Sequence, residues 1–174
     1  MADTIAQFEH VISICRDLFV KKLKDYGASW RIMRPQSVTD QIFIKAKRIR
    51  SIETKGESKI DEGVRSELIG IVNYGIIGLI QLHLGYSDSE DITVERALDL
   101  YDKYMTETKE LMYAKNHDYD EAWRSMRISS YTDLILTKIC RTKQIENNNG
   151  KTLVSEGVLS LIHISEPTRP ISIS

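Results

Sequence analysis

Apolar residues recur at helical spacing along most of the chain. Between Thr4 and about Lys24 they stand mostly three or four positions apart, at Ile5, Phe8, Ile12, Cys15, Phe19 and Leu23. This spacing places them on one stripe of an amphipathic helix. We predict that Asp3 or Thr4 caps the start of this helix and that Gly27 ends it in a left-handed turn.

The same pattern predicts three further helices. Ser37 followed by Asp40 resembles a capping arrangement, and the segment TDQIFIKAKRIRSIET then continues helically to Gly56. A third helix is expected over residues 59–84 and a fourth over residues 93–116. No window shows the period-two alternation and turn residues that are typical of strand hairpins. We therefore predict an all-α fold.

One phrase, Asp-Tyr-x-x-x-Trp-Arg-x-Met-Arg, occurs twice in the chain. Sliding residues 25–53 onto residues 118–146 without a gap gives fourteen identical positions in twenty-nine. We therefore predict internally duplicated three-helix units, at about residues 4–84 and 93–158. A single unit has little core of its own, so the two units should pack against each other as one helical bundle, a single domain over residues 1–158.

The end of the second unit differs from that of the first. With one extra residue the sequence EGV at 156–158 still matches 62–64, but the following LSLIHISEPTRPISIS does not align with the hydrophobic RSELIGIVNYGIIGLIQL. The tail resembles an in-frame translation of a sequencing-library adapter, so we interpret residues 159–174 as non-native. A natural tail with two prolines is the alternative. On the first interpretation the C-terminus is truncated and the second unit lacks its last helix.

Composition limits the classes of partner. Lys plus Arg number 24 against 25 for Asp plus Glu, and the net charge of -1 gives no global attraction to nucleic acid or an anionic membrane. Any anion site must be local. The most apolar stretch contains Asn73, Gln81 and four glycines, which favours a buried core helix over a membrane span. Cys15 and Cys140 lie far apart inside apolar helical patterns and form no C-x-x-C pair, so we predict that they are reduced core thiols of a cytoplasmic protein.

Aromatic rings and guanidinium groups concentrate in and after both copies of the repeated phrase. One interpretation is a nucleotide site, in which rings stack on a base and cations hold phosphate. The candidates are Tyr26, Trp30, Arg31, Arg34, Lys45 and Arg48 in the first copy, and Tyr119, Trp123, Arg124, Lys138 and Arg141 in the second. Lysine and arginine three apart share a helix face in each copy. The structural alternative is that the tryptophans join the two halves while Asp25 or Asp118 pairs with an arginine across the turn.

The third expected helix carries Glu62, Glu67, Asn73 and Tyr74. All-α nucleoside triphosphate pyrophosphohydrolases hold magnesium through carboxylates three or four apart on one helix face. Glu62 and Glu67 are five apart, about 140° around a helix, so they do not share a face. Gly70 stands where a Glu-x-x-Asp pair would be completed. The acidic set is incomplete, so we predict no metal site, and magnesium at Glu62 and Glu67 is the alternative to test.

The segments LKDYGASWR, IKAKRIRSIE and ELIGIVNYGIIGLIQL resemble the nucleotide-modification-associated domain, type 1, a helical family of phages and bacteria whose function has long been unknown. The similarity covers roughly residues 17–84 and 110–158. The positions that match the family pattern are Lys45, Arg48, Glu62, Asn73 and Tyr74. Many members carry Asp where this chain has Ser66 and Gly70, which weakens any transfer of metal-dependent catalysis. The resemblance implies a link to nucleotide or modified-base metabolism, without an established reaction.

The function that we expect is binding of a nucleotide or nucleotide-derived ligand by a cytoplasmic helical domain. Glu62 and Asn73 join the aromatic and basic candidates in lining that site. One alternative is a noncatalytic helical scaffold or dimerisation module, which would make the chain a homodimer. Another is a magnesium-dependent pyrophosphohydrolase-like enzyme with Glu62 and Glu67 as metal ligands. The sequence leaves open whether the chain is an enzyme.

Overall fold

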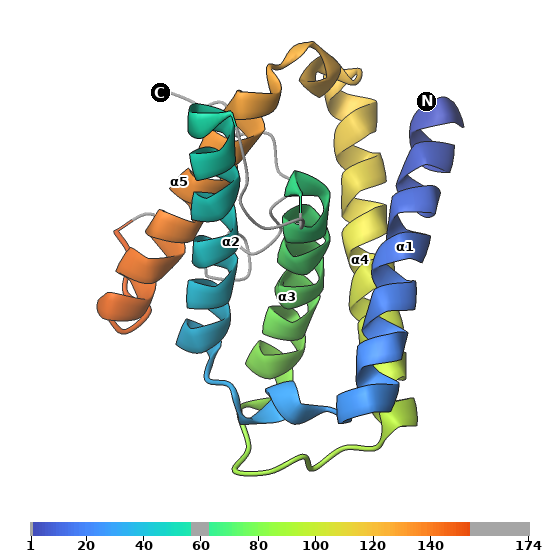
Figure 1. Cartoon of the computed structure of the whole chain (residues 1–174), viewed down its shortest axis with the longest axis vertical. Coiled ribbons are helices and arrows are strands. Elements are labelled where there is room, and N and C mark those ends of the chain that lie inside the picture. Colours follow the sequence, from blue (N-terminus) through green and yellow to red (C-terminus); the bar gives the residue numbers. More distant parts are fainter. Residues whose placement is uncertain (1, 57–62, 154–174) are drawn as a thin grey trace.

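The computed structural model describes residues 2–56 and 63–153, and the regular structure within these ranges is entirely helical (Figure 1). The elements are α1 (Ala2–Tyr26), η1 (Ser29–Ile32), α2 (Pro35–Lys55), α3 (Val64–Leu84), α4 (Val94–Tyr119), η2 (Ala122–Ser125) and α5 (Ile128–Asn147), where η marks a single 3-10 turn. The all-α prediction is confirmed. The C-terminal end of α4 extends three residues further than the sequence pattern indicated.

The central helix is α3, which lies between α2 on one side and the antiparallel pair α1 and α4 on the other (Figure 1). The fifth helix, α5, packs on another face of α2. Phe19 of α1 and Tyr101 of α4 stack with ring centroids 4.2 Å apart, and Ile80 of α3 is fully buried. Among the described residues α3 alone has the length and hydropathy of a membrane span, and 56% of that stretch is buried inside the bundle. Packing on several sides accounts for its apolar composition.

Two expected helix caps are wrong. Asp3 and Thr4 lie inside α1, which begins at the residue before them. α2 begins at Pro35, two residues before Ser37, and it has no side-chain cap. A proline in the first position presets the helical φ and has no N–H that would need an acceptor. Gly27 does end α1 in the left-handed region, at φ 62°.

The two cysteines differ in burial. Cys15 is fully buried, as expected, whereas Cys140 is exposed, so the prediction of two core thiols is wrong for Cys140. Position 140 in α5 corresponds through the repeat to Lys47 in α2, and both lie on the solvent face of their helix. The surrounding apolar pattern did not separate this face from the buried one.

The two Trp-Arg connectors follow the same backbone path from the 3-10 turn to the next helix, although the residue before the turn differs, with φ of -88° at Ala28 and 58° at Glu121. η1 and η2 begin and end 93 residues apart, and in both the amide after the turn donates to the carbonyl of the tryptophan, Trp30 or Trp123, at 3.0 Å. Arg34 and Arg127 then precede the next helix with φ of -68° in both copies and ψ of 152° and 145°. The repeat in the sequence is therefore a repeat in the structure.

Contacts between the units are reciprocal. The Thr39 hydroxyl of α2 donates to Glu146 of α5 at 2.7 Å, and the Thr132 hydroxyl of α5 donates to Glu53 of α2 at 2.7 Å. Each residue of the second bond lies 93 positions from its counterpart in the first, so exchanging the two units exchanges the two bonds. Reciprocity of this kind is the mark of an isologous, twofold interface.

Four ion pairs in the described part of the chain obey the same twofold relation. They are Asp40–Lys143 and Asp133–Arg50 between α2 and α5, and Asp102–Arg16 and Glu9–Lys109 between α1 and α4. The two units thus face each other through equivalent helices across an internal twofold axis. α3 has no described counterpart, because residues 154–174, which include the tail interpreted as non-native, lie outside the described residues.

Candidate functional site

Arg31, one of the predicted ligand-binding residues, is 2% exposed and is held by groups of the protein itself. Its guanidinium donates to both carboxylate oxygens of Asp91 (2.7 and 3.2 Å), to the Gly85 carbonyl (2.6 Å) and to the side-chain oxygen of Gln81. The paired guanidinium holds the pKa of the Asp91 carboxyl below its ordinary value. Arg31 therefore joins the η1 turn to the loop after α3.

Arg124 occupies the equivalent position in η2 but remains partly exposed. Its guanidinium donates to Glu121 at 3.1 Å and to Gln7 of α1 at 2.9 Å, and also bonds the hydroxyl of Thr4. It also lies over the ring of Trp123, 4.6 Å from the centroid. Arg31 pairs with Asp91 outside the repeated phrase, and Arg124 pairs with Glu121 at a variable position within it, so the expected pairing with Asp25 or Asp118 is absent from the described contacts.

The tryptophans pack within their own units. Trp30 is half-buried against Phe19 of α1, with centroids 6.3 Å apart. The indole N–H of Trp123 donates to Asn116 of α4 at 2.8 Å. The structural alternative, in which the tryptophans join the two halves, therefore does not describe these contacts. Each ring fixes its connector to the preceding helix.

The remaining polar candidates of the connectors are scattered. Tyr26 is 66% exposed, and the exposed Arg34 lies 5.8 Å from the centre of the Tyr86 ring. Tyr119 is half-buried at the end of α4. Arg34 precedes Lys45 by eleven residues, which corresponds to roughly 16 Å along a helix. The connector and the basic pair of α2 are therefore separate places on the molecule.

Asn73 is a buried link between three helices. Its amide nitrogen donates to the Cys15 carbonyl of α1 at 3.1 Å, and its oxygen accepts from the Tyr101 hydroxyl of α4 at 2.8 Å. Burial raises the pKa of that Tyr101 hydroxyl strongly, so it remains a hydrogen-bond donor at neutral pH. These contacts occupy both polar atoms of Asn73 inside the protein.

Lys45 and Arg48, the basic pair of α2, converge on one carboxylate of α3. Glu67 is 5% exposed and accepts from the Lys45 ammonium at 3.4 Å and from the Arg48 guanidinium. The two cationic side chains are each about a quarter exposed, with values of 26% and 25%. The predicted shared helix face is therefore correct. Two cationic side chains therefore share one carboxylate, and Arg48 has a further interaction within the protein. Glu62, also predicted here, lies outside the described residues.

Two further residues of α3 shape this cluster. Lys45 lies 5.9 Å from the centre of the Tyr74 ring, at the distance of a cation–π contact. Gly70 provides space, since a Cβ at this position would lie 2.8 Å from Lys45 Cε. We use the name basic groove for this set of contacting residues of α2 and α3, which are Lys45, Arg48, Glu67, Gly70 and Tyr74. Sequence reasoning listed Tyr74 only as a match and treated Gly70 as a missing acid, because the space that a glycine leaves is not visible in a sequence.

The second copy does not reproduce the basic groove among the described residues. Lys138 is 6% exposed and interacts within the protein, whereas Arg141 is exposed on α5. The residues that would take the place of Glu67 fall in the part of the chain that the structure does not describe. The described geometry therefore brings a basic pair onto one carboxylate in the first unit.

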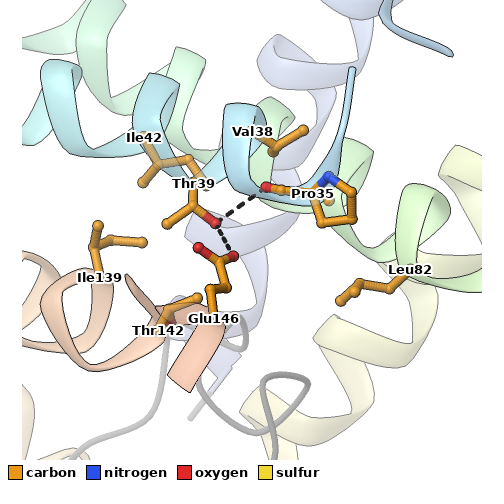
Figure 2. Close-up of a pocket in the computed structure, with 9 residues that line it drawn as sticks. Pro35, Val38, Thr39, Ile42, Leu82, Ile139, Thr142 and Glu146 are labelled. Carbon is orange, nitrogen blue, oxygen red and sulfur yellow. Dashed lines mark hydrogen bonds between the residues drawn. The ribbon is translucent and has the colours of Figure 1, made fainter. Parts of the chain in front are cut away.

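A recess between α2, α3 and α5 contains none of the predicted ligand-binding residues (Figure 2). Its walls are mostly apolar, and its polar feature is the Glu146 carboxylate that accepts from the Thr39 hydroxyl. The open volume is about 320 Å³, including solvent at the mouth, so the enclosed part is smaller than typical ligand pockets of roughly 300–1,000 Å³. We therefore place the candidate site at the basic groove, where the charges converge.

Within residues 2–56 and 63–153, no cluster of three or more His, Cys, Asp and Glu side chains could hold a metal ion. In the basic groove, Glu67 is the only carboxylate in contact with the two cations among the described contacts. These residues alone therefore do not form a magnesium site.

Comparison with protein families decides the classification. The family model for Nucleotide modification associated domain 1 matches residues 22–82 and 115–162, which together make up more than half of the chain. The chain belongs to this family. The resemblance read from the sequence is thereby confirmed. A search of curated proteins and a search of solved structures each gave no match.

The two Nucleotide modification associated domain 1 matches begin 93 residues apart, the interval that also separates η1 from η2. Each match includes a Trp-Arg connector and the basic pair of the following helix. The first match also includes nearly all of α3, and with it the whole basic groove. The family boundaries thus agree with a duplicated unit.

Proposed function

We propose that this chain binds a nucleotide or nucleotide-derived ligand, and that the basic groove holds the ligand's phosphate. The observation that carries the proposal is the convergence of Lys45 and Arg48 on Glu67. The carboxylate orients both cationic side chains, each of which is about a quarter exposed. The family description, Nucleotide modification associated domain 1, supports a nucleotide as the ligand class.

The donor chemistry of the groove suits a phosphate. Arginine has five N–H donors and lysine three, so Lys45 retains donors after its contact with Glu67. Charge-assisted hydrogen bonds to phosphate oxygens are stronger than neutral ones. The half-buried ring of Tyr74 lies beside Lys45 and offers an aromatic surface for a base or sugar. Arg31, Asn73 and the two tryptophans support the fold around this groove.

The proposal predicts thermal stabilisation by deoxynucleotides. A ligand that binds only the folded state must raise the melting temperature. We expect mono-, di- or triphosphates to shift the wild-type transition, and Lys45→Ala and Arg48→Ala to lose the shift. Lys47→Ala is the matched control, because Lys47 is an exposed lysine on another face of the same helix. The melting temperature of each variant without ligand is its own reference.

The same screen distinguishes the alternatives. Absence of a shift across the whole panel would contradict nucleotide binding and favour a noncatalytic scaffold or dimerisation module. A shift that requires magnesium, with release of pyrophosphate from triphosphates, would favour the hydrolase. We further propose a cytoplasmic location without a membrane partner, which fits two free thiols and a soluble nucleotide ligand.

A further inference from the structure

Tyr74 places an aromatic ring two turns along α3 from Glu67, on the same face of the helix. Seven residues correspond to nearly two full turns and roughly 10 Å of rise, so the two side chains stand in one row. The Lys45 ammonium reaches this row between them, because its Nζ would lie 3.2 Å from a Cβ built on Gly70. Along α3 the basic groove therefore presents a carboxylate, an ammonium and a ring, in that order.

The ring of Tyr74 is held by the core but remains partly accessible. It packs against the buried hydrophobic cluster of the bundle and is itself half-buried. A side chain that is already fixed loses little conformational entropy when a ligand contacts it. Any nucleobase can stack on such a ring, because every base has a π face. Tyr74 is therefore a suitable stacking surface for a base.

The separation of the ammonium and the ring determines which phosphate can be bound together with a base. Lys45 Nζ lies 5.9 Å from the centre of the Tyr74 ring, near the outer limit of roughly 6 Å for a cation–π contact. In a nucleotide only the sugar separates the base from the phosphate attached to it, whereas the outer phosphates lie further away. A base stacked on Tyr74 therefore brings the sugar-linked phosphate to Lys45, whose side chain is 26% exposed.

We propose that the basic groove recognises a nucleoside monophosphate unit, in which Lys45 binds the phosphate attached to the sugar and Tyr74 stacks on the base. This inference rests on the proposed nucleotide function. It adds the class of ligand and a residue that determines specificity for nucleotides over other phosphate compounds. On this inference the outer phosphates of a triphosphate contribute little to the affinity.

Binding is measured by calorimetry in a buffer that contains magnesium, and by competition where the affinity is low. The probes are the four deoxynucleoside monophosphates, their triphosphates, and deoxyribose 5-phosphate, which has the phosphate but no base. A base–aromatic stack changes affinity by roughly 5- to 150-fold. We therefore expect wild type to bind at least one monophosphate about fivefold or more tighter than deoxyribose 5-phosphate. That monophosphate should bind within about tenfold of its triphosphate.

Substitutions of tyrosine separate the role of the ring from that of folding. Tyr74→Phe keeps the ring and should retain the preference for the monophosphate over deoxyribose 5-phosphate. Tyr74→Leu removes the ring and should abolish this preference, while the affinity for deoxyribose 5-phosphate remains unchanged. Tyr86→Leu is the matched control, because Tyr86 also lies near a cation, 5.8 Å from Arg34, but beyond the C-terminal end of α3. The melting temperature of each variant reports its folding.

Three results would overturn this inference while nucleotide binding itself remains. The first is a wild-type preference for every monophosphate over deoxyribose 5-phosphate of less than about fivefold, and the second is a triphosphate that binds more than about tenfold tighter than its monophosphate. Both are measured on wild type and do not depend on the folding of Tyr74→Leu. The third is an unchanged preference in Tyr74→Leu. Absence of binding to all monophosphates and triphosphates overturns the proposed nucleotide function together with this inference.

Discussion

At the scale of single residues, the two copies of the repeated phrase give the same arginine two environments. Arg31 is buried and bonds Asp91, Gln81 and a backbone carbonyl. Arg124 is 38% exposed at its side chain and bonds surface groups. The partners of Arg31 lie 50 to 60 residues later in the chain and outside the repeated phrase. An identical motif therefore does not imply an identical role.

This difference predicts unequal costs of truncation. Arg31→Ala leaves the side-chain oxygen of the buried Gln81 without its partner, so we expect a loss of about 3 kcal/mol in the free energy of unfolding. Arg124→Ala should cost less than about 1 kcal/mol, as is usual for exposed ion pairs. Urea unfolding of both variants measures the two values. If both substitutions lowered the free energy of unfolding equally, the result would contradict our inference that the buried structural role belongs to Arg31 and not to Arg124.

The candidate site could be predicted only in part at this scale. The spacing of Lys45 and Arg48 correctly placed both on one face, because helical geometry fixes the direction of side chains three apart. The aromatic connector was grouped with them because its residue types suit nucleotides. Its position was not predictable, since it depends on how α1, α2 and α3 pack. Residue types indicate chemistry, whereas partners depend on the tertiary fold.

At the scale of elements, two glutamates that are equivalent through the repeat differ in burial at the α2–α5 contact. Glu53 is exposed and Glu146 is half-buried, although both accept a threonine hydroxyl at 2.7 Å. Burial raises the pKa of the Glu146 carboxyl above its ordinary value of 4.5, with a smaller opposing contribution from the Thr39 hydrogen bond (Figure 2). The neighbouring Asp40 raises this pKa further, and Lys143 lowers it.

The raised pKa predicts a pH dependence of stability. The folded state holds the Glu146 proton more tightly than the unfolded state, so this contribution is fully present below pH 4.5 and is lost as pH rises through the raised pKa. Glu146→Gln removes the ionisation. We expect wild type to lose stability relative to this variant as pH rises from 4.5, measured by urea unfolding at several pH values.

Glu53→Gln makes the same chemical change in the equivalent bond at the exposed position. It therefore reports the cost of altering the threonine contact itself. A wild type that gained stability relative to Glu146→Gln over the same pH range would contradict the predicted sign.

Most helices were predictable, and their ends less so. Long apolar stripes identified the helical segments, because one buried face requires a regular spacing. The cap predictions at Thr4 and Ser37 were wrong because a suitable cap residue near a helix start does not fix the first turn. Pro35 began α2 earlier without a side-chain acceptor. Which helices are neighbours could not be predicted from periodicity, since every amphipathic stripe accepts several partners.

At the scale of the whole molecule, each charged residue in the twofold ion pairs has a residue of the same charge at the equivalent position of the other unit. Glu9 corresponds to Asp102 and Arg16 to Lys109, and the α2–α5 pairs show the same agreement. The first unit therefore carries both halves of each ion pair, as well as the Thr39 and Glu53 halves of the reciprocal hydrogen bonds. The repeat could be predicted from the sequence, whereas the internal twofold axis became evident only from the contacts between the units.

A self-complementary unit should associate with a second copy of itself. We expect residues 1–92, expressed alone, to form a twofold dimer in which Arg16 of each copy pairs with Glu9 of the other. In the full chain the equivalent pairs are Lys109 with Glu9 and Arg16 with Asp102. Sedimentation equilibrium would show twice the fragment mass. Arg16→Glu creates like-charge contacts at two places in this dimer but at one in the full chain, so it should weaken the dimer by roughly 1–2 kcal/mol while the full chain keeps its fold. A fragment that folded as a stable monomer would show that the core of one unit is sufficient, and that the twofold contacts between units are incidental to folding.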